Sequence, residues 1–206
     1  MGMLPRHIEQ TIDVPKSLYV RFGKQMLDLM LCLLLALPVL AVCAVVSVLI
    51  KLDSKGPVLF RQPRFGKDGR EFQIYKFRTM YIDAPRQGRS PVSDRDPRIT
   101  RIGRLLRKTS IDELPQLINV LRGEMSFVGP RPEQSSIVQK YYTGYERQRF
   151  LVKPGITGLW QISMDRTKPI HENLSYDLQY IREMSLGLDL WIILQTVLIV
   201  CKSNTC

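Results

Sequence analysis

Two adjacent carboxylates, Asp112 and Glu113, are the residues of this chain whose types and spacing best suit phosphate chemistry. They follow Ser110, and a serine three residues before a glutamate predicts a capping box that starts a helix. Gly123 predicts where that helix stops. The apolar positions at helical spacing between them are Leu114, Leu117, Ile118 and Leu121. The sequence therefore predicts an amphipathic helix with both acids in its first turn.

The local sequence leaves two interpretations of this acid pair open. Acids in the first turn of a helix commonly do no more than complement the positive end of the helix dipole. The same helix end also binds phosphate groups through its free backbone N–H donors. An ionised Asp112 could then attack phosphorus while Glu113 holds a divalent metal. The residues around the pair have to separate a simple cap from a catalytic site.

Positive charge surrounds the acid pair. The chain has 206 residues, which suits one domain with its own core, and its net charge is +11. Between residues 61 and 108 there are 14 Lys and Arg against 5 Asp and Glu. A surface of this kind attracts nucleic acid, acidic lipid headgroups or phosphorylated small molecules. It is either a solvated or lipid-bound face, or a wall that binds a polyanion together with the acids.

The segment from Leu29 to Ile50 is almost entirely apolar and is long enough to cross a bilayer as a helix. Pro38 lies near its middle and should kink or break such a helix, because proline lacks the N–H donor and clashes with the preceding turn. Lys and Arg flank both ends, and such residues prefer the cytoplasmic side. A simple span and a re-entrant hairpin that enters and leaves by the same face both remain open.

A small β-hairpin and several short helices must position the acid pair. Residues 58–60 and 72–80 predict two strands, the second because its side chains partly alternate between apolar and polar, and residues 66–69 predict the turn. Helices are predicted over residues 102–108, 134–150, 175–183 and 186–200. The last of these is apolar and partly amphipathic, so it is expected at the membrane interface or against the first apolar segment.

Two proline- and glycine-containing loops complete the candidate site. Gly129-Pro130-Arg131-Pro132 leaves its backbone little freedom and fixes where Arg131 points, and arginine suits bidentate phosphate contact. The second loop, residues 153–158, is similarly rigid and begins with Lys153. Together with the elements above, these loops predict one mostly helical α+β domain.

Four runs of residues together resemble a known family. The runs are Tyr75–Met80, Ser110–Pro115, Ser126–Pro132 and Lys153–Gly158. In their order and spacing they resemble the bacterial sugar transferases, also called monotopic polyprenyl-phosphate phosphoglycosyl transferases, of the small type that consists of the catalytic domain only. The resemblance covers nearly the whole chain.

The resemblance implies an activity and a location. Members transfer a phosphosugar from a UDP-sugar to undecaprenyl phosphate, which gives a lipid-linked diphosphate sugar and UMP and starts the assembly of exopolysaccharide, O-antigen or glycoprotein glycans. It implies Mg²⁺ as cofactor, membrane lipid but no nucleic acid among the partners, and leaves oligomerisation open. It also implies a re-entrant membrane helix over residues 21–55 in the bacterial inner membrane, a preceding extension over 1–20 and a cytoplasmic catalytic domain over 56–206.

The resemblance also assigns roles to individual residues. Asp112 matches the family's nucleophile, and Glu113 matches the catalytic glutamate associated with magnesium. Pro38 matches the residue that breaks the membrane helix. The positions implied to bind the phosphates or the nucleotide are Lys76, Arg78, Arg131, Lys153 and Asp177.

Three departures from the family pattern stand out. The membrane helix has Leu37-Pro38 instead of Ser-Pro, and measured from Asp28 the proline comes about one turn early. Lys153 replaces an arginine, which keeps the charge but loses the bidentate fork. Met164-Asp165 stands where many members have Gly-Arg, so a different choice of sugar is expected if this loop contacts the substrate.

Two alternatives without catalysis are a membrane-tethered protein that binds polyanions and a scaffold for glycan assembly. A nucleic-acid binder would need exposed aromatic side chains interleaved with the basic residues and no requirement for the acids. Replacement of Asp112 by asparagine separates these interpretations, because it should abolish transfer, preserve polyanion binding and leave a scaffold unaffected.

Overall fold

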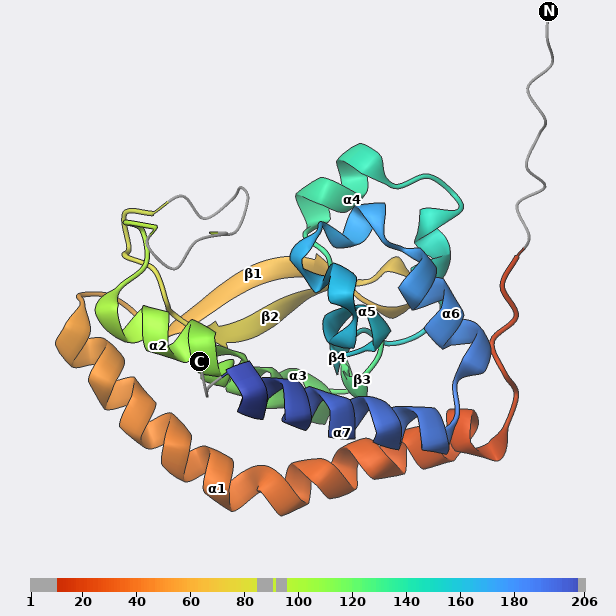
Figure 1. Cartoon of the computed structure of the whole chain (residues 1–206), viewed down its shortest axis with the longest axis horizontal. Coiled ribbons are helices and arrows are strands. Elements are labelled where there is room, and N and C mark those ends of the chain that lie inside the picture. Colours follow the sequence, from red (N-terminus) through yellow and green to blue (C-terminus); the bar gives the residue numbers. More distant parts are fainter. Residues whose placement is uncertain (1–10, 85–90, 92–95, 204–206) are drawn as a thin grey trace, which may run out of the picture.

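The computed structural model describes residues 11–84, 91 and 96–203. Its helices are α1 (Lys24–Asp53), α2 (Arg101–Thr109), α3 (Leu117–Leu121), α4 (Ser135–Tyr141), α5 (Leu159–Ile162), α6 (Ser175–Glu183) and α7 (Leu186–Ser203), and its strands are β1 (Leu59–Phe65), β2 (Glu71–Phe77), β3 (Ser126–Val128) and β4 (Gly155–Thr157). The long helix α1 forms one side of the molecule, the β1–β2 hairpin lies inside it, and α4, α5 and α6 gather at the far end of the hairpin (Figure 1). This arrangement confirms a mostly helical α+β fold with a small β-hairpin.

The hairpin is antiparallel, with Leu59 opposite Phe77 and Phe65 opposite Glu71. Its second strand buries Phe72, Ile74 and Phe77, as the partial alternation predicted. A second, parallel pair joins β3 to β4. Each of these strands has three residues, and neither strand was predicted from the sequence.

The β3–β4 pair brings the two rigid loops into close contact. The Gly155 N–H donates to the Pro130 carbonyl at 2.9 Å, and the Gly129 N–H donates to the Thr157 carbonyl at 2.9 Å. A Cβ atom at Gly155 would lie 2.1 Å from the Gly129 nitrogen, so a side chain there would push the loops apart. The positions of Arg131 and Lys153 are therefore coupled through the backbone.

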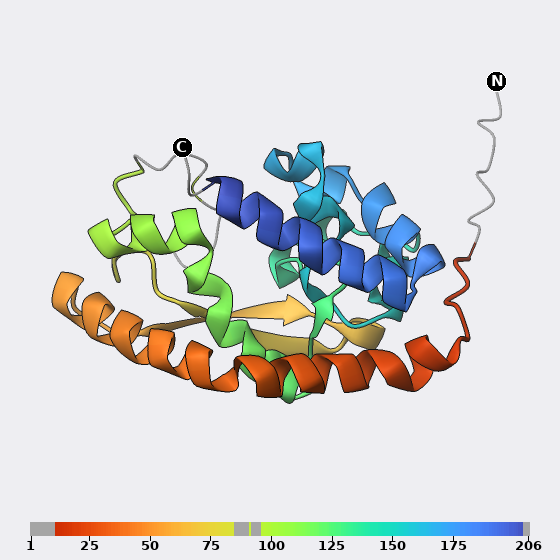
Figure 2. The same ribbon diagram turned by 60° about the horizontal axis from the view of Figure 1, so that its bottom comes forward.

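The apolar N-terminal segment forms the single continuous helix α1. It is the one described helix long and apolar enough to cross a membrane, and Pro38 lies at its midpoint. Both views show a bend near the middle of the helix, where proline removes a backbone hydrogen bond (Figures 1 and 2). The outward side exposes Leu33, Leu34, Leu37 and Leu40.

The first half of α1 is fastened to the body by polar contacts. Asp28 is buried and accepts hydrogen bonds from the Ser126 hydroxyl at 3.0 Å and the Phe127 N–H at 2.9 Å. Lys24 forms an ion pair of 2.5 Å with Asp189 in α7, so the two apolar helices meet at this end. Beyond it α7 packs against α5, β3 and β4.

The segment around the acids departs from the predicted capping box. Ser110 adopts the left-handed conformation, with φ 57°, and its side chain does not cap. Residues 111–116 form a 3₁₀ turn that includes Pro115, and only α3 follows as regular helix. The prediction of a capping box was wrong because the carboxylate of Glu113 is held by distant cations instead of the local backbone. The predicted stop is confirmed, since Gly123 has φ +73°.

The face of α3 that packs on the hairpin was also predicted incorrectly. Asn119 is fully buried; its side chain accepts from the Tyr75 N–H and donates to the Gln73 carbonyl. Ile118 and Leu121 are instead exposed. Asn119 occupies the buried face of α3, because its side chain pairs with backbone groups of β2 that would otherwise lack partners.

Among the other predicted helices, three are confirmed and one is divided. Residues 102–108 lie in α2, residues 175–183 match α6, and residues 186–200 lie in α7. The predicted helix over 134–150 is wrong in its middle, because α4 ends at Tyr141 and a separate 3₁₀ turn spans Glu146–Leu151. The carboxylate of Glu146 accepts from the Thr143 N–H at 2.7 Å, within the break between the two helical segments.

Helix α2 depends on a glycine where it packs on the end of the hairpin. A Cβ at Gly103 would lie 2.1 Å from the carbonyl oxygen of Thr79, which is fixed because it accepts from the Thr100 N–H. We expect Gly103→Ala to lower the thermal midpoint, with a cost of about 1–3 kcal/mol from overpacking. A melting curve checks this. Gly187→Ala in α7 is the matched control, because its Cβ meets nothing within 4 Å; equal losses in both variants would refute the steric argument.

Candidate active site

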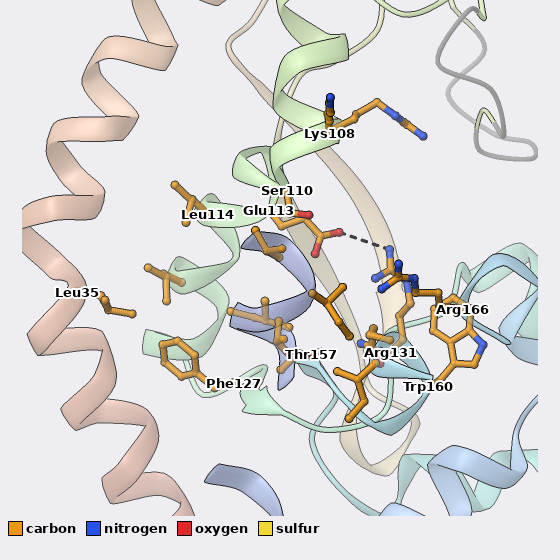
Figure 3. Close-up of a pocket in the computed structure, with 18 of the residues that line it drawn as sticks. Leu35, Lys108, Ser110, Glu113, Leu114, Phe127, Arg131, Thr157, Trp160 and Arg166 are labelled. Atoms are coloured by element: carbon orange, nitrogen blue, oxygen red, sulfur yellow. Dashed lines mark hydrogen bonds and ion pairs between the residues drawn. The ribbon is translucent and has the colours of Figure 1, made fainter. Parts of the chain in front are cut away.

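The acid pair meets two cations supplied by distant parts of the chain. The Lys76 ammonium, at the end of β2, lies 2.6 Å from Oε1 of Glu113. The Arg131 guanidinium, in the loop after β3, lies 3.4 Å from the same oxygen (Figure 3). The structure therefore brings together four of the predicted site residues: Lys76, Asp112, Glu113 and Arg131. It joins the hairpin, the 3₁₀ turn and the first rigid loop at one point.

The two carboxylates differ strongly in acidity. Burial is the main cause that raises the pKa of Asp112 to about 6; Lys76 acts against it, and the negative charge of Glu113 adds a smaller upward effect. Burial also acts upward on Glu113, but Lys76 and Arg131 outweigh it and bring its pKa down to about 2. Glu113 thus stays ionised, while Asp112 titrates just below neutral pH. Two coupled carboxyl groups with separated pKa values suit separate roles in catalysis.

The two carboxylates line two different cavities. Glu113 lines one of about 580 Å³, which lies between α1, α7 and the rigid loops. Asp112 lines another of about 450 Å³ beside the hairpin. Arg107 lines both, and its guanidinium is steadied by donation to the Pro91 carbonyl at 3.0 Å. Each carboxylate therefore lines its own space, and both spaces have a size that suits small-molecule ligands.

The cavity beside the hairpin has a strongly cationic lining. Its basic residues are Arg61, Arg64, Lys76, Arg78, Arg98 and Arg107, and Asp112 is the one acid among the described residues that line it. Cations grouped around a single carboxylate suit a ligand with several phosphate oxygens. This is the space in which Asp112 would meet such a ligand.

Arg78 is part of that lining, but its guanidinium also has a structural task. It donates to the carbonyl of Ser54 at 2.7 Å and to the carbonyl of Lys55, just beyond the end of α1. Arg78 therefore ties the C-terminal end of α1 to the cavity wall. Its predicted contact with phosphate stays a prediction.

Several contacts fix the position of the Arg131 side chain. Its guanidinium lies 5.7 Å from the ring centroid of Trp160, and its side chain is 34% exposed (Figure 3). Its backbone carbonyl accepts from Arg149. The side chain is thus held between an aromatic ring and Glu113, where it can still reach a ligand in the larger cavity.

Asp177 and Lys153 lie outside the described linings of both cavities. Asp177 is buried, and its carboxylate pairs with Arg149 at 2.6 Å. Burial raises the pKa of Asp177 to about 6 against the opposing effect of Arg149. The Nζ atom of Lys153 lies 3.5 Å from the Cβ position of Gly123. The structure does not bring these two predicted residues to the acid pair.

Sequence reasoning missed three arginines that the structure makes prominent. Arg107 lines both cavities, Arg64 lines the hairpin cavity, and Arg149 supports the Arg131 loop. Arg107 precedes the acid pair by five residues within a basic helix, which was a usable signal. Arg149 had none, because two of its partners, Arg131 and Asp177, come from segments 18 and 28 residues away.

The acid pair offers carboxylate oxygens that could bind magnesium. No group of three or more His, Cys, Asp and Glu side chains suited to a metal occurs among the described residues. Mg²⁺ commonly takes only one or two protein carboxylates and completes its shell with water and substrate phosphate oxygens. Lys76 and Arg131 both pair with Oε1 of the ionised Glu113, and Asp112 is the adjacent residue in the chain. The acid pair therefore fits the small number of protein carboxylates that Mg²⁺ commonly takes.

Sequence comparison places the site in a family. The model of the bacterial sugar transferase family matches residues 19–203. A UDP-glucose:undecaprenyl-phosphate glucose-1-phosphate transferase of Escherichia coli K12 is 40% identical over 90% of this chain and 41% of its own length. An undecaprenyl-phosphate glucose phosphotransferase of Komagataeibacter xylinus is 44% identical over 89% of this chain and 36% of its own length.

A third relative names another sugar. The UDP-N-acetylgalactosamine-undecaprenyl-phosphate N-acetylgalactosaminephosphotransferase of Aeromonas hydrophila is 39% identical over 89% of this chain and 44% of its own length. The chain thus spans less than half the length of these three relatives. The match to the family model covers α1, the hairpin, the acid pair and both rigid loops. This chain belongs to the bacterial sugar transferase family.

Proposed function

We propose that the chain transfers a phosphosugar from a UDP-sugar to undecaprenyl phosphate, giving undecaprenyl-diphosphate sugar and UMP, and so initiates glycan assembly. The observation that carries the proposal is the position of the acid pair between two cavities whose linings are rich in cations. Both proposed substrates are phosphate anions, and each would have its own space. The names of the three relatives support the substrate classes.

The reaction has two steps. An oxygen of Asp112 attacks the phosphorus that carries the sugar, and a new P–O bond forms as the bond to the bridging oxygen breaks and UMP leaves with the electron pair. An oxygen of the lipid phosphate then attacks the same phosphorus, the bond to Asp112 breaks, and the carboxylate is restored. With a pKa of about 6, Asp112 is mostly ionised at neutral pH and ready to attack.

The cations would act mainly through electrostatics. Phosphoryl transfer depends on positioning and on neutralising the charge that spreads over the phosphate oxygens. Lys76 and Arg131 already lie at the acid pair, and Arg78 lines the cavity that Asp112 faces. Lys153 and Asp177 would act at a distance, through the coupled loops and through Arg149 respectively.

A bound Mg²⁺ would supply further neutralisation of the diphosphate. Glu113 is the residue proposed to hold it, with Asp112 beside it, because Glu113 remains ionised over the whole physiological pH range. The protein's own contribution is to hold that carboxylate in place with Lys76 and Arg131.

The apolar surface suggests how the active site reaches a lipid substrate. Leucines line the outside of α1, and α7 exposes Leu190, Trp191, Leu194 and Leu198. We propose that the bend at Pro38 lets α1 enter and leave the bacterial inner membrane by its cytoplasmic face, since Lys24 and Lys51 flank its ends. The acid pair would then lie at headgroup depth.

The test is UMP release from a panel of UDP-sugars in the presence of undecaprenyl phosphate and Mg²⁺. The proposal expects release that depends on both substrates. Labelled UMP should also exchange into the UDP-sugar without lipid if an Asp112 intermediate forms. An active enzyme without exchange would instead favour direct attack by the lipid phosphate, and an inactive one would favour the polyanion-binding or scaffold alternatives.

Two aromatic residues of β2 do not offer the stacking surface that the nucleic-acid alternative needs. Tyr75 and Phe77 lie in β2 of the basic hairpin and are only 8% and 3% exposed. Bases cannot stack on rings that are buried in the core. Arg61 and Arg122 also cover Tyr75, at 5.1 and 5.2 Å from its ring centroid.

Lys76 gives the site a testable pH dependence. It favours the ionised form of Asp112, so its removal should raise the pKa of Asp112 above about 6. We expect Lys76→Met to move the acidic limb of the UMP-release profile to higher pH, because more of the nucleophile is protonated at a given pH. Initial rates measured across the acid-to-neutral range check this. Lys76→Arg is the control, and a limb that stays in place in Lys76→Met would contradict the assignment.

A further inference from the structure

The larger cavity combines two kinds of lining that one ligand class would need together. Its apolar wall comes from α1, the turn before α3, and α7; the residues are Leu35, Val39, Leu114, Leu117, Ile199 and Val200. Its polar end carries four basic residues, Arg107, Lys108, Arg131 and Arg166, and Glu113 is the one acid among the described residues that line it. Such a lining suits an anionic head joined to an apolar chain.

The position of the apolar wall indicates where the chain of such a ligand would lie. Leu35 and Val39 are one helical turn apart on α1, on either side of Pro38, and both are half-buried. The residues next to them, Leu34 and Leu40, are 72% and 65% exposed on the outer side. Figure 3 shows Leu35 facing Leu114 and Phe127 across the cavity, with Glu113 and Arg131 further in. The cavity thus connects the apolar helix to the acid pair.

Gln161 provides an independent sign that a ligand completes this cavity. It lies in α5 and lines the cavity, yet both its amide nitrogen and its amide oxygen are buried without a hydrogen-bond partner. A buried amide left without partners costs free energy, and a polar group of a bound ligand would supply the missing partners. Its N–H₂ group, in the same lining as Arg131 and Arg166, suits a phosphate oxygen.

From these observations we infer that the cavity between α1 and α7 binds the phosphate head and the first isoprenoid units of a polyprenyl phosphate, with Gln161 donating to the head and Val39 and Ile199 lining the chain. The inference rests on the proposed function and adds to it a site for the lipid separate from that of the nucleotide. The acceptor would reach the phosphosugar on Asp112 from the side of Glu113. The remainder of the chain would extend into the bilayer past α1.

Bulky substitutions in the apolar wall test the inference. Val39→Trp should raise the KM for undecaprenyl phosphate by about tenfold or more while it changes the KM for the UDP-sugar much less. Leu40→Trp is the matched control, because this neighbour adds the same ring to the same helix on its exposed side. Ile199→Trp, with Leu198→Trp as its control, repeats the test from α7 and covers the case in which Val39→Trp does not fold.

The polar end is tested by Gln161→Met, which keeps the length of the side chain but removes the amide. It should raise the KM for undecaprenyl phosphate and weaken inhibition by a short-chain prenyl phosphate in parallel. Val39→Trp should weaken that inhibition as well, whereas inhibition by inorganic phosphate should respond to Gln161→Met alone.

The outcomes separate the inference from the proposed function. Absence of UMP release by the unsubstituted protein would refute the proposed function. If that protein is active, a rise in the KM for the UDP-sugar in Val39→Trp would assign the cavity to the nucleotide and overturn the inference alone. Equal effects of Val39→Trp and Leu40→Trp would also overturn it, because the cause would then be embedding in the membrane.

Discussion

Replacement of Asp112 by asparagine is expected to lower the rate of UMP release by about 10⁴-fold or more, in the range seen when other enzymes lose their nucleophile. The amide has nearly the same shape, so the fold and the cationic lining should persist. It cannot, however, form the bond to phosphorus that the first step requires. Exchange of labelled UMP into the UDP-sugar should disappear together with net transfer.

Two controls make this result specific. Asp68→Asn changes an acid in the hairpin turn, and asparagine tolerates the positive φ of 57° at that position; it should keep full activity. Binding of a polyanion to the Asp112→Asn variant should be unchanged or tighter, because one negative charge is removed from a cationic cavity. Retention of transfer within a few-fold would show that Asp112 is not the nucleophile.

Loss of the buried partner of Arg149 should have the largest effect on stability. The side chains of Arg149 and Asp177 are 1% and 2% exposed and lie 2.6 Å apart. Asp177→Asn would leave the Arg149 guanidinium buried with its charge uncompensated, at a cost of about 3–5 kcal/mol. For a domain of this size we expect the melting temperature to fall by roughly 10 °C. Thermal unfolding followed by circular dichroism measures the change.

The exposed pair of Lys168 and Asp165 provides the comparison. These side chains are 63% and 30% exposed, so solvent screens the pair and Asp165→Asn should lower the melting temperature far less than Asp177→Asn does. The double substitution Arg149→Met with Asp177→Leu removes both buried charges and should recover much of the stability lost in Asp177→Asn. If Asp177→Asn melts at the temperature of the unsubstituted protein, the buried pair does not stabilise this part of the fold.

The same pair also bears on activity. Arg149 donates to the backbone carbonyl of Arg131, and the Arg131 side chain reaches Glu113. We therefore propose that Asp177 acts as a positioning residue, three contacts away from the acid pair. Its role at a substrate-binding position stays a prediction from the sequence, and the buried pair with Arg149 offers a physical reason for an aspartate at this position.

Local patterns predicted the parts of the fold that local forces determine. The alternation of Phe72 and Ile74 identified β2, and the basic run before Thr109 identified α2. Gly123 ends its helix as predicted, because its positive φ is a property of the residue itself. Contacts between distant segments defeated the same reasoning. The carboxylate of Glu113 does not form the predicted cap. It pairs instead with Lys76 and Arg131, which lie 37 and 18 residues away in the chain.

The parallel β3–β4 pair was hidden for a related reason. Three residues carry too little periodicity to indicate a strand, and the pairing depends on the approach of Gly129 to Gly155. The apolar pattern also misled the assignment of the inner face of α3. It assumed that apolar residues point to the core, whereas Ile118 and Leu121 are exposed in a protein whose surroundings are proposed to include lipid.

The shared position of Arg107 has a consequence for how the two substrates influence each other. One guanidinium lines both spaces, so an anion on one side uses positive potential that an anion on the other side also needs. By thermodynamic linkage, nucleotide and lipid should then bind antagonistically, each weakening the affinity for the other. Departure of UMP would then strengthen the binding of the lipid acceptor, because the two anions compete for a single positive charge.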